Sequence, residues 1–149
     1  MGESDSQAAD LRARIVKAAQ DAMVAAAGTD YTVNGRTTDG FDCSGFVSYV
    51  FKKVFPDFAH MDTEHIAASK LFVKVVAYRP GDLIFFPAGT VPYALKHGDK
   101  RLYPRHVGVL VDHGHWISSQ SSTGPAKVAI NNLWWGSRPY YFLSFVKLN

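Results

Sequence analysis

The spacing of apolar residues changes along the chain, from helical intervals in the first half to strand-like alternation in the second. In the N-terminal segment the apolar positions lie three and four residues apart: Leu11, Ile15, Ala18, Ala22 and Ala25. This spacing predicts a helix over about residues 6–27 that ends at Gly28, because glycine readily leaves helical backbone.

A second helical pattern follows a turn-rich stretch. Five apolar residues share one of its faces: Phe46, Val47, Val50, Phe51 and Val54. The pattern ends before Pro56, which disfavours helical backbone at the preceding residue, and it places Cys43 near the start of the helix. A short third helix is predicted over about residues 62–69.

The second half of the chain carries alternating, β-branched and aromatic residues that predict five strands: residues 82–86, 106–111, 115–120, 127–130 and 141–147. Helices followed by strands with tight turns between them are typical of an α+β fold with an antiparallel sheet. With 149 residues and no linker-like run, we expect a single domain, residues 1–149.

Composition narrows the classes of protein. A chain that is 47% hydrophobic and 19% charged is not intrinsically disordered, and one cysteine excludes an intramolecular disulfide and a multi-cysteine metal cage. The net charge of +3, without a run of like charges, gives no support for nucleic-acid binding. No apolar stretch is long enough for membrane insertion, and the polar N-terminus is unlike a signal peptide. We expect a monomer made in the cytoplasm.

Cys43 is the first candidate for chemistry. Asp42 stands where the cap of the second helix is expected, so Cys43 would lie in the first turn, among unpaired N–H groups at the positive end of the helix dipole. Such a position lowers thiol pKa values and favours the nucleophilic thiolate, and the same N–H groups would stabilise an oxyanion. The alternative is that Cys43 is a small buried apolar residue.

A nucleophilic thiol needs a base, and among the six histidines His106 is the best placed, because it opens an apolar strand directly after a loop. Asp112, His113 and His115 suggest a metal site, but they lie in an expected hairpin turn, and no further ligands stand at characteristic spacing. We therefore expect a Cys–His pair and no metal or organic cofactor.

Three motifs together resemble the NlpC/P60 cysteine peptidases of bacterial cell walls. They are GTDYTVNGRTTDGFDCSGFV (residues 28–47), RPGDLIFF (residues 79–86) and HVGVLV (residues 106–111). Their order and spacing agree with those of the family. The resemblance implies a papain-like core over about residues 28–149, with the N-terminal helix as an extension of it.

The resemblance assigns roles to several residues. Cys43 matches the nucleophile and His106 the general base, while Tyr31, Asp42 and Ser44 match positions that border the nucleophile and contact the peptide substrate. The alternatives are that Tyr31 is packed beneath the loop and that Asp42 only caps the helix. Asp82 is expected to anchor the turn after Gly81.

The third catalytic position departs from the family pattern, which usually has a histidine twelve residues after the catalytic histidine. Ser118 stands there instead. Gln120 lies two residues further on, hence on the same strand face, and its longer amide would also reach an imidazole. Both Ser118 and Gln120 are candidates for the residue that orients His106.

Two further regions have open interpretations. The segment over residues 87–105 is longer than the usual connection and would set specificity or act as a lid, and its basic residues would meet carboxylates of a peptide stem unless they are simply solvated: Lys96, Lys100, Arg101 and Arg105. Aromatic residues near the C-terminus would line a sugar-binding groove or, more in keeping with their position, belong to the core: Trp134, Trp135, Tyr140 and Tyr141.

The resemblance implies hydrolysis of amide bonds in peptidoglycan peptide stems, such as the bond between D-glutamate's γ-carboxyl and a diamino acid. A small catalytic domain without a recognisable leader resembles the type VI secreted amidase effectors, which implies action in the periplasm or cell wall after non-classical export, and a cognate immunity protein as partner. The alternatives are a thiol acyltransferase or amidase that acts on a small molecule or lipid, and an inactive cell-wall-binding module.

Overall fold

The computed structural model describes residues 3–89 and 104–149. Three helices come first along the chain, interrupted only by a short hairpin, and the six strands of the main sheet follow them. Helix α1 spans Glu3–Ala25, α2 spans Cys43–Val54 and α3 spans Thr63–Ala68. The buried apolar residues of α1 are Ile15, Ala19 and Ala22, and the two small alanines allow close packing against α2 and the sheet.

The main sheet has six strands in the order β3-β8-β4-β5-β6-β7, and every neighbouring pair is antiparallel. The strands are β3 (Phe72–Val75), β4 (Leu83–Phe86), β5 (His106–Leu110), β6 (His115–Gln120), β7 (Gly124–Ala129) and β8 (Tyr141–Phe145). A small hairpin of β1 (Arg36–Thr37) and β2 (Gly40–Phe41) precedes α2.

The expected α+β fold with an antiparallel sheet is confirmed, with four additions. The β1–β2 hairpin and the edge strand β3 are short, and α5 (Leu133–Gly136) is a single turn, so none of them carries a long enough hydrophobic pattern to be predicted. A final 3-10 turn, η1, covers Val146–Leu148.

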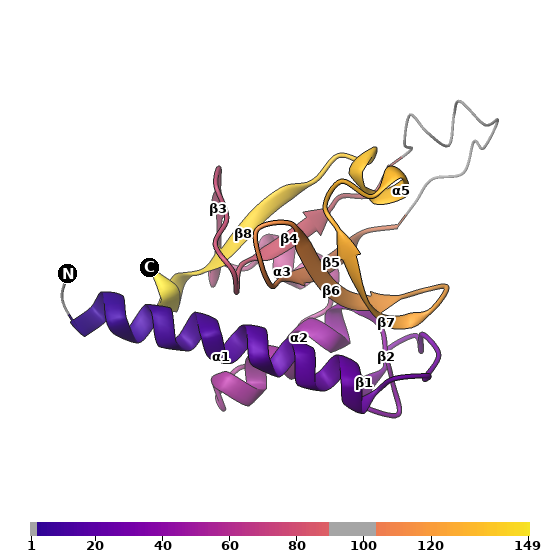
Figure 1. Ribbon diagram of the computed structural model, residues 1–149, viewed down its shortest axis with the longest axis horizontal. Helices are drawn as coiled ribbons and strands as arrows, with labels where there is room; N and C mark the ends of the chain where they lie inside the picture. The colour runs from indigo at the N-terminus through magenta and orange to yellow at the C-terminus, as the bar shows by residue number, and fades with distance from the viewer. Residues whose placement is uncertain (1–2, 90–103) are drawn as a thin grey trace.

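The two faces of the sheet bury different clusters, because successive strand residues point to opposite sides. Leu83, Phe85, Val107 and Val109 pack with the residues of α1 and α2, including Cys43, in what we call the helix-face cluster. On the other face, the aromatic cluster consists of buried and half-buried residues: Ile84, Phe86, Leu110, Trp116, Tyr78, Val128, Ile130, Trp135 and Phe142. Figure 1 shows α1 and α2 along one side of the sheet and α5 at the far end of β8.

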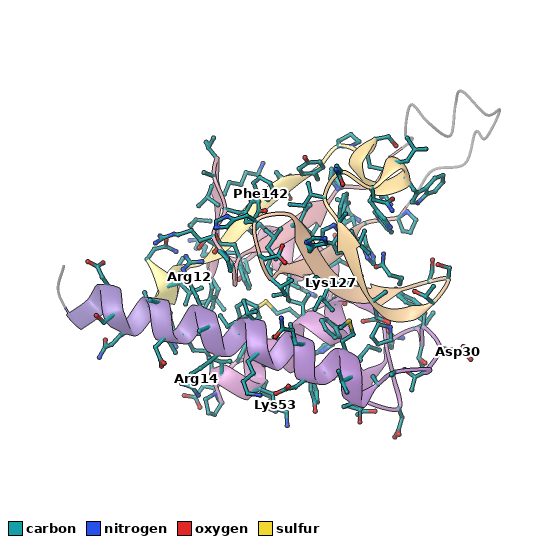
Figure 2. The ribbon with its side chains drawn as sticks, viewed as in Figure 1. Arg12, Arg14, Asp30, Lys53, Lys127 and Phe142 are labelled. Carbon is teal, nitrogen blue, oxygen red and sulfur yellow. The ribbon has the colours of Figure 1, made fainter. Side chains whose placement is uncertain are left out.

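A buried ion pair fastens α1 to the turn before β4. Arg12 Nη1 lies 2.8 Å from Asp82 Oδ1, and Asp82 Oδ2 accepts the N–H of Arg79 at 2.9 Å, which confirms Asp82 as the anchor of this turn. Arg12 also donates to Ser144 Oγ of β8. Figure 2 shows Arg12 on the sheet side of α1 and Arg14 on the opposite side. The N-terminal helix is therefore bound into the fold by a buried charge pair.

None of the helices that the structure describes is both long and apolar enough to cross a lipid bilayer.

Candidate active site

Cys43 is the first residue of α2, and Asp42 is its N-cap, as the sequence predicts. Asp42 Oδ1 accepts the Gly45 N–H at 2.6 Å and the Ser44 hydroxyl at 3.2 Å, while Oδ2 accepts the N–H of Asn34 at 3.0 Å. The carboxylate thus binds the preceding loop to the start of the helix. This holds Cys43 in a fixed position at the helix N-terminus.

The loop before α2 also explains why residue 45 is a glycine. The carbonyl oxygen of Gly35 lies so close to Gly45 that any Cβ there would collide with it, and the Asp42 N–H donates to the same oxygen at 3.2 Å. A residue larger than glycine would push the loop away from the nucleophile position.

The Cys43 thiol is buried, with only 3% of the residue exposed. Burial raises its pKa to about 11, although the N–H groups of Val107 and Ser44 and the Tyr31 hydroxyl donate to the sulfur and favour the thiolate. The expected lowering of the thiol pKa is therefore wrong for the resting protein. Withdrawal from water outweighs the donors at the helix start.

Tyr31 contacts the nucleophile position directly. Its oxygen accepts the N–H of Cys43 and its hydroxyl donates to the sulfur, while burial, followed by the negative charges of Cys43 and Asp42, raises the pKa of the phenol. The tyrosine therefore remains a neutral donor beside the thiol at neutral pH.

His106 is the first residue of β5, and its Nε2 lies 2.6 Å from Gln120 Oε1. Because an amide oxygen accepts, this contact assigns the proton of a neutral imidazole to Nε2 and leaves Nδ1 as the basic nitrogen. Burial lowers the pKa of His106 to about 4; the hydrogen bond to Gln120 raises it and the charge of Arg138 lowers it. The ring is neutral at pH 7.

The structure brings Gln120, and not Ser118, against His106. Ser118 Oγ instead donates to the carbonyl oxygen of Val107 at 2.6 Å. The reason is the register of the β5–β6 hairpin: Val109 lies opposite Ile117, and three residues further this register brings Gln120 opposite His106.

The Cys43 thiol contacts the peptide unit that directly follows His106. The N–H that donates to Cys43 belongs to the peptide bond between His106 and Val107, and the Ser118 hydroxyl holds the carbonyl of Val107. Ser119 donates to the carbonyl of Phe41 at 2.8 Å, which connects β6 to the residue before the helix cap. The three strand positions 118, 119 and 120 thus each support a different part of the site.

The sequence interpretation missed the role of the aromatic residues. Trp135, on α5, stacks on the imidazole of His106 with ring centroids 4.6 Å apart and an interplanar angle of 24°. The rings of Trp116 and Phe86 lie 5.6 and 6.2 Å from the same imidazole. No spacing rule signals this contact, because Trp135 is distant in sequence and lies on a single helical turn.

The alternative metal site has a structural explanation. His115 Nδ1 lies 2.9 Å from Asp112 Oδ1, and Lys127 Nζ lies 3.6 Å from the other oxygen of the same carboxylate. Among the described residues there is no group of three or more His, Cys, Asp or Glu side chains that could hold a metal ion. A lysine facing the carboxylate disfavours a cation there.

A basic groove runs along the exposed side of α2. Its volume is about 540 Å³ and it extends from Gly45, two residues after the nucleophile position, to Pro56; its cationic lining comes from Arg36, Lys52 and Lys53. The half-buried His60 also lines it, but burial and the charge of Arg36 lower the pKa of this histidine. Of the basic residues predicted to meet carboxylates from the long connection, Lys96, Lys100 and Arg101 lie outside the described residues, and Arg105 is exposed.

Comparisons with known proteins agree with this geometry. Residues 28–141 match the model of the NlpC/P60 family, and the chain belongs to that family. It is 29% identical over 108 residues to a protein named probable endopeptidase NlpC from Escherichia coli strain K12, and 28% identical over 111 residues to the murein DD-endopeptidase MepS/murein LD-carboxypeptidase of the same organism. These matches cover 72% and 74% of this chain, and 64% and 53% of the two relatives.

Solved structures show the same fold. The NlpC/p60 domain of the peptidoglycan hydrolase SagA superposes with a TM-score of 0.62 at 24% identity, covering 90% of this chain and 98% of that domain. NlpC2 from Trichomonas vaginalis gives a TM-score of 0.62 at 19% identity, covering 97% of this chain and 47% of that one. The expected family resemblance is thereby confirmed.

Proposed function

We propose that the chain is a cysteine hydrolase that cleaves amide bonds in the peptide stems of peptidoglycan. The observation that carries the proposal is the meeting of Cys43, at a helix N-terminus, with the His106–Val107 peptide unit, while His106 is oriented by Gln120. The peptide unit after His106 thus joins the proposed nucleophile to the proposed base, and Gln120 is the proposed orienting group.

In this mechanism Cys43 and His106 begin as a neutral pair. Because Nε2 faces Gln120, Nδ1 is the nitrogen that takes the thiol proton, once the thiol turns from the Val107 N–H to the imidazole on the other side of this peptide unit and the sulfur attacks the amide carbonyl. N–H groups at the start of α2 stabilise the tetrahedral oxyanion. The amine then leaves with the proton from His106, and water releases the acyl-enzyme.

The neutral resting pair has a consequence for rate. A thiol with a pKa of about 11 and an imidazole with a pKa of about 4 do not form a stable ion pair in the free protein. Proton transfer therefore accompanies attack on the substrate, whose developing oxyanion and whose displacement of water change the surroundings of both groups.

Tyr31, Asp42 and Ser44 have supporting roles in the proposal. Tyr31 donates to the sulfur and would turn to the substrate when the thiol forms a bond. Asp42 and Ser44 are hydrogen-bonded to each other at the helix cap, so their contribution to substrate binding would come through the position of the loop and through the outer surface of the cap. Ser118 supports the Val107 carbonyl.

The substrate class is supported by charge and by the relatives. Peptide stems of murein carry carboxylates, and the groove beside Gly45 presents Arg36, Lys52 and Lys53. A bond such as that between D-glutamate's γ-carboxyl and a diamino acid would place a free carboxylate close to this groove. One similar protein from Escherichia coli is named a murein DD-endopeptidase and murein LD-carboxypeptidase, and another is named a probable endopeptidase.

We further propose that the protein acts in the periplasm or cell wall and is antibacterial, with a cognate immunity protein as its partner. Expression directed to the periplasm should then lyse a host cell, whereas cytosolic expression should be harmless. Equal toxicity in both compartments would contradict a cell-wall target.

The decisive experiment is digestion of defined muropeptides by the wild-type protein and by Cys43→Ala, with the products resolved by mass. We expect the wild-type protein to release stem fragments and the variant to release none. An inactive binding module, which the raised pKa of the buried thiol would also suit, predicts no products from either protein. A thiol acyltransferase predicts mass shifts that match transfer to an added amine.

A further inference from the structure

We propose that Trp135 is a positioning residue that covers one face of the His106 imidazole and holds the ring in the plane in which Nε2 meets Gln120. The proposal rests on the proposed function, because it assigns Trp135 to the general base of that reaction.

The geometry distinguishes Trp135 from the other aromatic neighbours of His106. Its ring is nearly parallel to the imidazole, at 24°, whereas Phe86 and Trp116 meet it at 42° and 66° from greater distances. The hydrogen bond to Gln120 lies in the plane of the imidazole and fixes the position of Nε2, but it leaves the ring free to tilt out of this plane. A parallel ring on one face restrains the tilt that this bond leaves free.

Local hydrogen bonds fix Trp135 itself. Asn132 caps α5, and its side-chain oxygen accepts the N–H groups of Trp134 and Trp135 at 3.0 and 3.1 Å. The Gly136 N–H donates to the carbonyl of Asn132 at 2.7 Å, and a Cβ at Gly136 would press on the carbonyl of Ile130. A single turn is therefore held rigidly enough to set the position of a side chain.

A second restraint comes from Arg138. Its guanidinium lies 4.8 Å from the centroid of the Trp135 ring and 5.5 Å from that of Phe86, and Nη2 donates to the carbonyl of Pro104 at 2.9 Å. Pro104 is two residues before His106, so the arginine connects α5 to the segment that leads into β5.

Among the residues that the structure describes, three groups surround the His106 imidazole. From α5 and the residues after it, Arg138 faces the ring; from β6, Gln120 bonds to it; on the far side of the adjacent peptide unit lies the Cys43 thiol. Tyr140 contacts Phe86, with centroids 5.8 Å apart. Arg138 is the charged residue among the described ones that affects the pKa of His106, and burial outweighs it; the ring that covers the face of the imidazole contributes to that burial.

Removal of the Trp135 ring should admit water to the face of His106. We expect two linked results: the pKa of His106 rises from about 4 towards 6.5, and the Nε2 proton exchanges faster because its bond to Gln120 is no longer held in plane. A ring that only filled space in the aromatic cluster would lower stability without either effect.

The test is an NMR titration of ¹⁵N-labelled histidine side chains, made in Cys43→Ala so that no turnover is needed. We expect Trp135→Leu to raise the pKa of His106 by at least about one unit and to broaden the Nε2 proton signal, and Trp135→Phe to keep both near the parent values. The matched control is Phe142→Leu. Phe142, labelled in Figure 2, packs in the same cluster against Tyr78 and Tyr140.

Kinetics provide the second readout, with Cys43 restored. Trp135→Leu should lower kcat by about tenfold with less than about a twofold change in KM, and Trp135→Phe should recover most of the loss. An unchanged His106 pKa in Trp135→Leu, or an equal change in Phe142→Leu, would overturn the proposal. If the His106 pKa responds as expected but the wild-type protein cleaves no stem, Trp135 still positions His106 and the proposed function fails.

Discussion

The two faces of the sheet hold the two reactive groups in different ways. On the helix face, Cys43 is positioned by backbone: a capped helix start, two N–H groups and a loop that approaches Gly45. On the aromatic face, His106 is positioned by side chains from two separate segments, namely Gln120 and Trp116 of β6 and Trp135 of α5. The nucleophile position depends on local structure and the base position on long-range packing.

Burial favours the neutral form of the titratable group on both faces, and it therefore shifts the pKa of the thiol and the pKa of the imidazole in opposite directions. It raises the pKa of the acid Cys43 and lowers the pKa of the base His106, so each group rests in its neutral form. The comparison predicts that changes on the helix face alter stability or binding and that changes on the aromatic face alter proton transfer.

The largest effect is expected from His106→Ala. Without a base, the buried thiol of Cys43 has no acceptor for its proton, so kcat/KM for muropeptide cleavage should fall by about 10³- to 10⁴-fold. Circular dichroism should show an unchanged fold. Retention of more than a tenth of the activity would mean that another group takes the proton.

The next largest effect lies on the helix face. Arg12→Ala leaves the carboxylate of Asp82 buried and unpaired, and we expect the free energy of unfolding to fall by about 3–5 kcal/mol. Urea denaturation measures it, and Arg14→Ala, on the exposed side of α1, is the matched control with a change below about 0.5 kcal/mol. Replacement of both charges, in Arg12→Met with Asp82→Leu, should restore much of the loss unless the turn bond to Arg79 dominates.

Acid should destabilise the aromatic face. His106 has a folded pKa of about 4, below its ordinary 6.5, so its contribution to stability is present above about pH 6.5 and is lost as the pH falls towards 4. The expected loss is on the order of 3 kcal/mol. Urea midpoints at several pH values measure this loss, and His106→Gln should remove most of the dependence of stability on pH between about 4 and 6.5.

On the helix face, we expect stability to be lost at alkaline pH instead. The pKa of Cys43 is raised from 9.0 to about 11, so its contribution is present below about pH 9 and is lost as the pH rises towards 11. Cys43→Ala should remove this alkaline loss and leave the acid loss in place. A single variant that removed both losses would show that the two faces are not independent.

The orienting residue gives a smaller effect. Gln120→Ala should lower kcat about 10²-fold, because His106 loses the bond that assigns its proton to Nε2. Ser118→Ala, the matched change on the same strand face, should cost less than about fivefold, because its hydroxyl bonds to the Val107 carbonyl. Equal losses would indicate that the β5–β6 register differs in the working enzyme.

The smallest effect is expected in the basic groove. Lys52→Glu should raise KM by about three- to tenfold for stems with a free carboxylate and much less for amidated stems, with kcat unchanged. Lys147→Glu, an exposed lysine on η1, controls for net charge. The same rise in both variants would show a general charge effect and would exclude a carboxylate subsite in the groove.

Sequence patterns were sufficient for the helix face. A cap residue, a glycine two positions after the cysteine and an apolar helical face all lie within residues 42–54, so Asp42, Cys43 and α2 could be predicted from local physical chemistry. The pKa of the thiol could not, because the helix start favours the thiolate and only the depth of burial decides against it.

The aromatic face shows the opposite. The sequence by itself determined the family and the α+β class, and it pointed to Cys43 and His106 as the pair that we propose to be reactive, because these inferences depend on motifs and short-range periodicity. Only the tertiary structure decided between Ser118 and Gln120, placed Trp135 on His106 and joined Arg12 to Asp82. Each of these depends on the register of a hairpin or on contacts between distant segments, and the energy of such contacts is absent from any local pattern of residues.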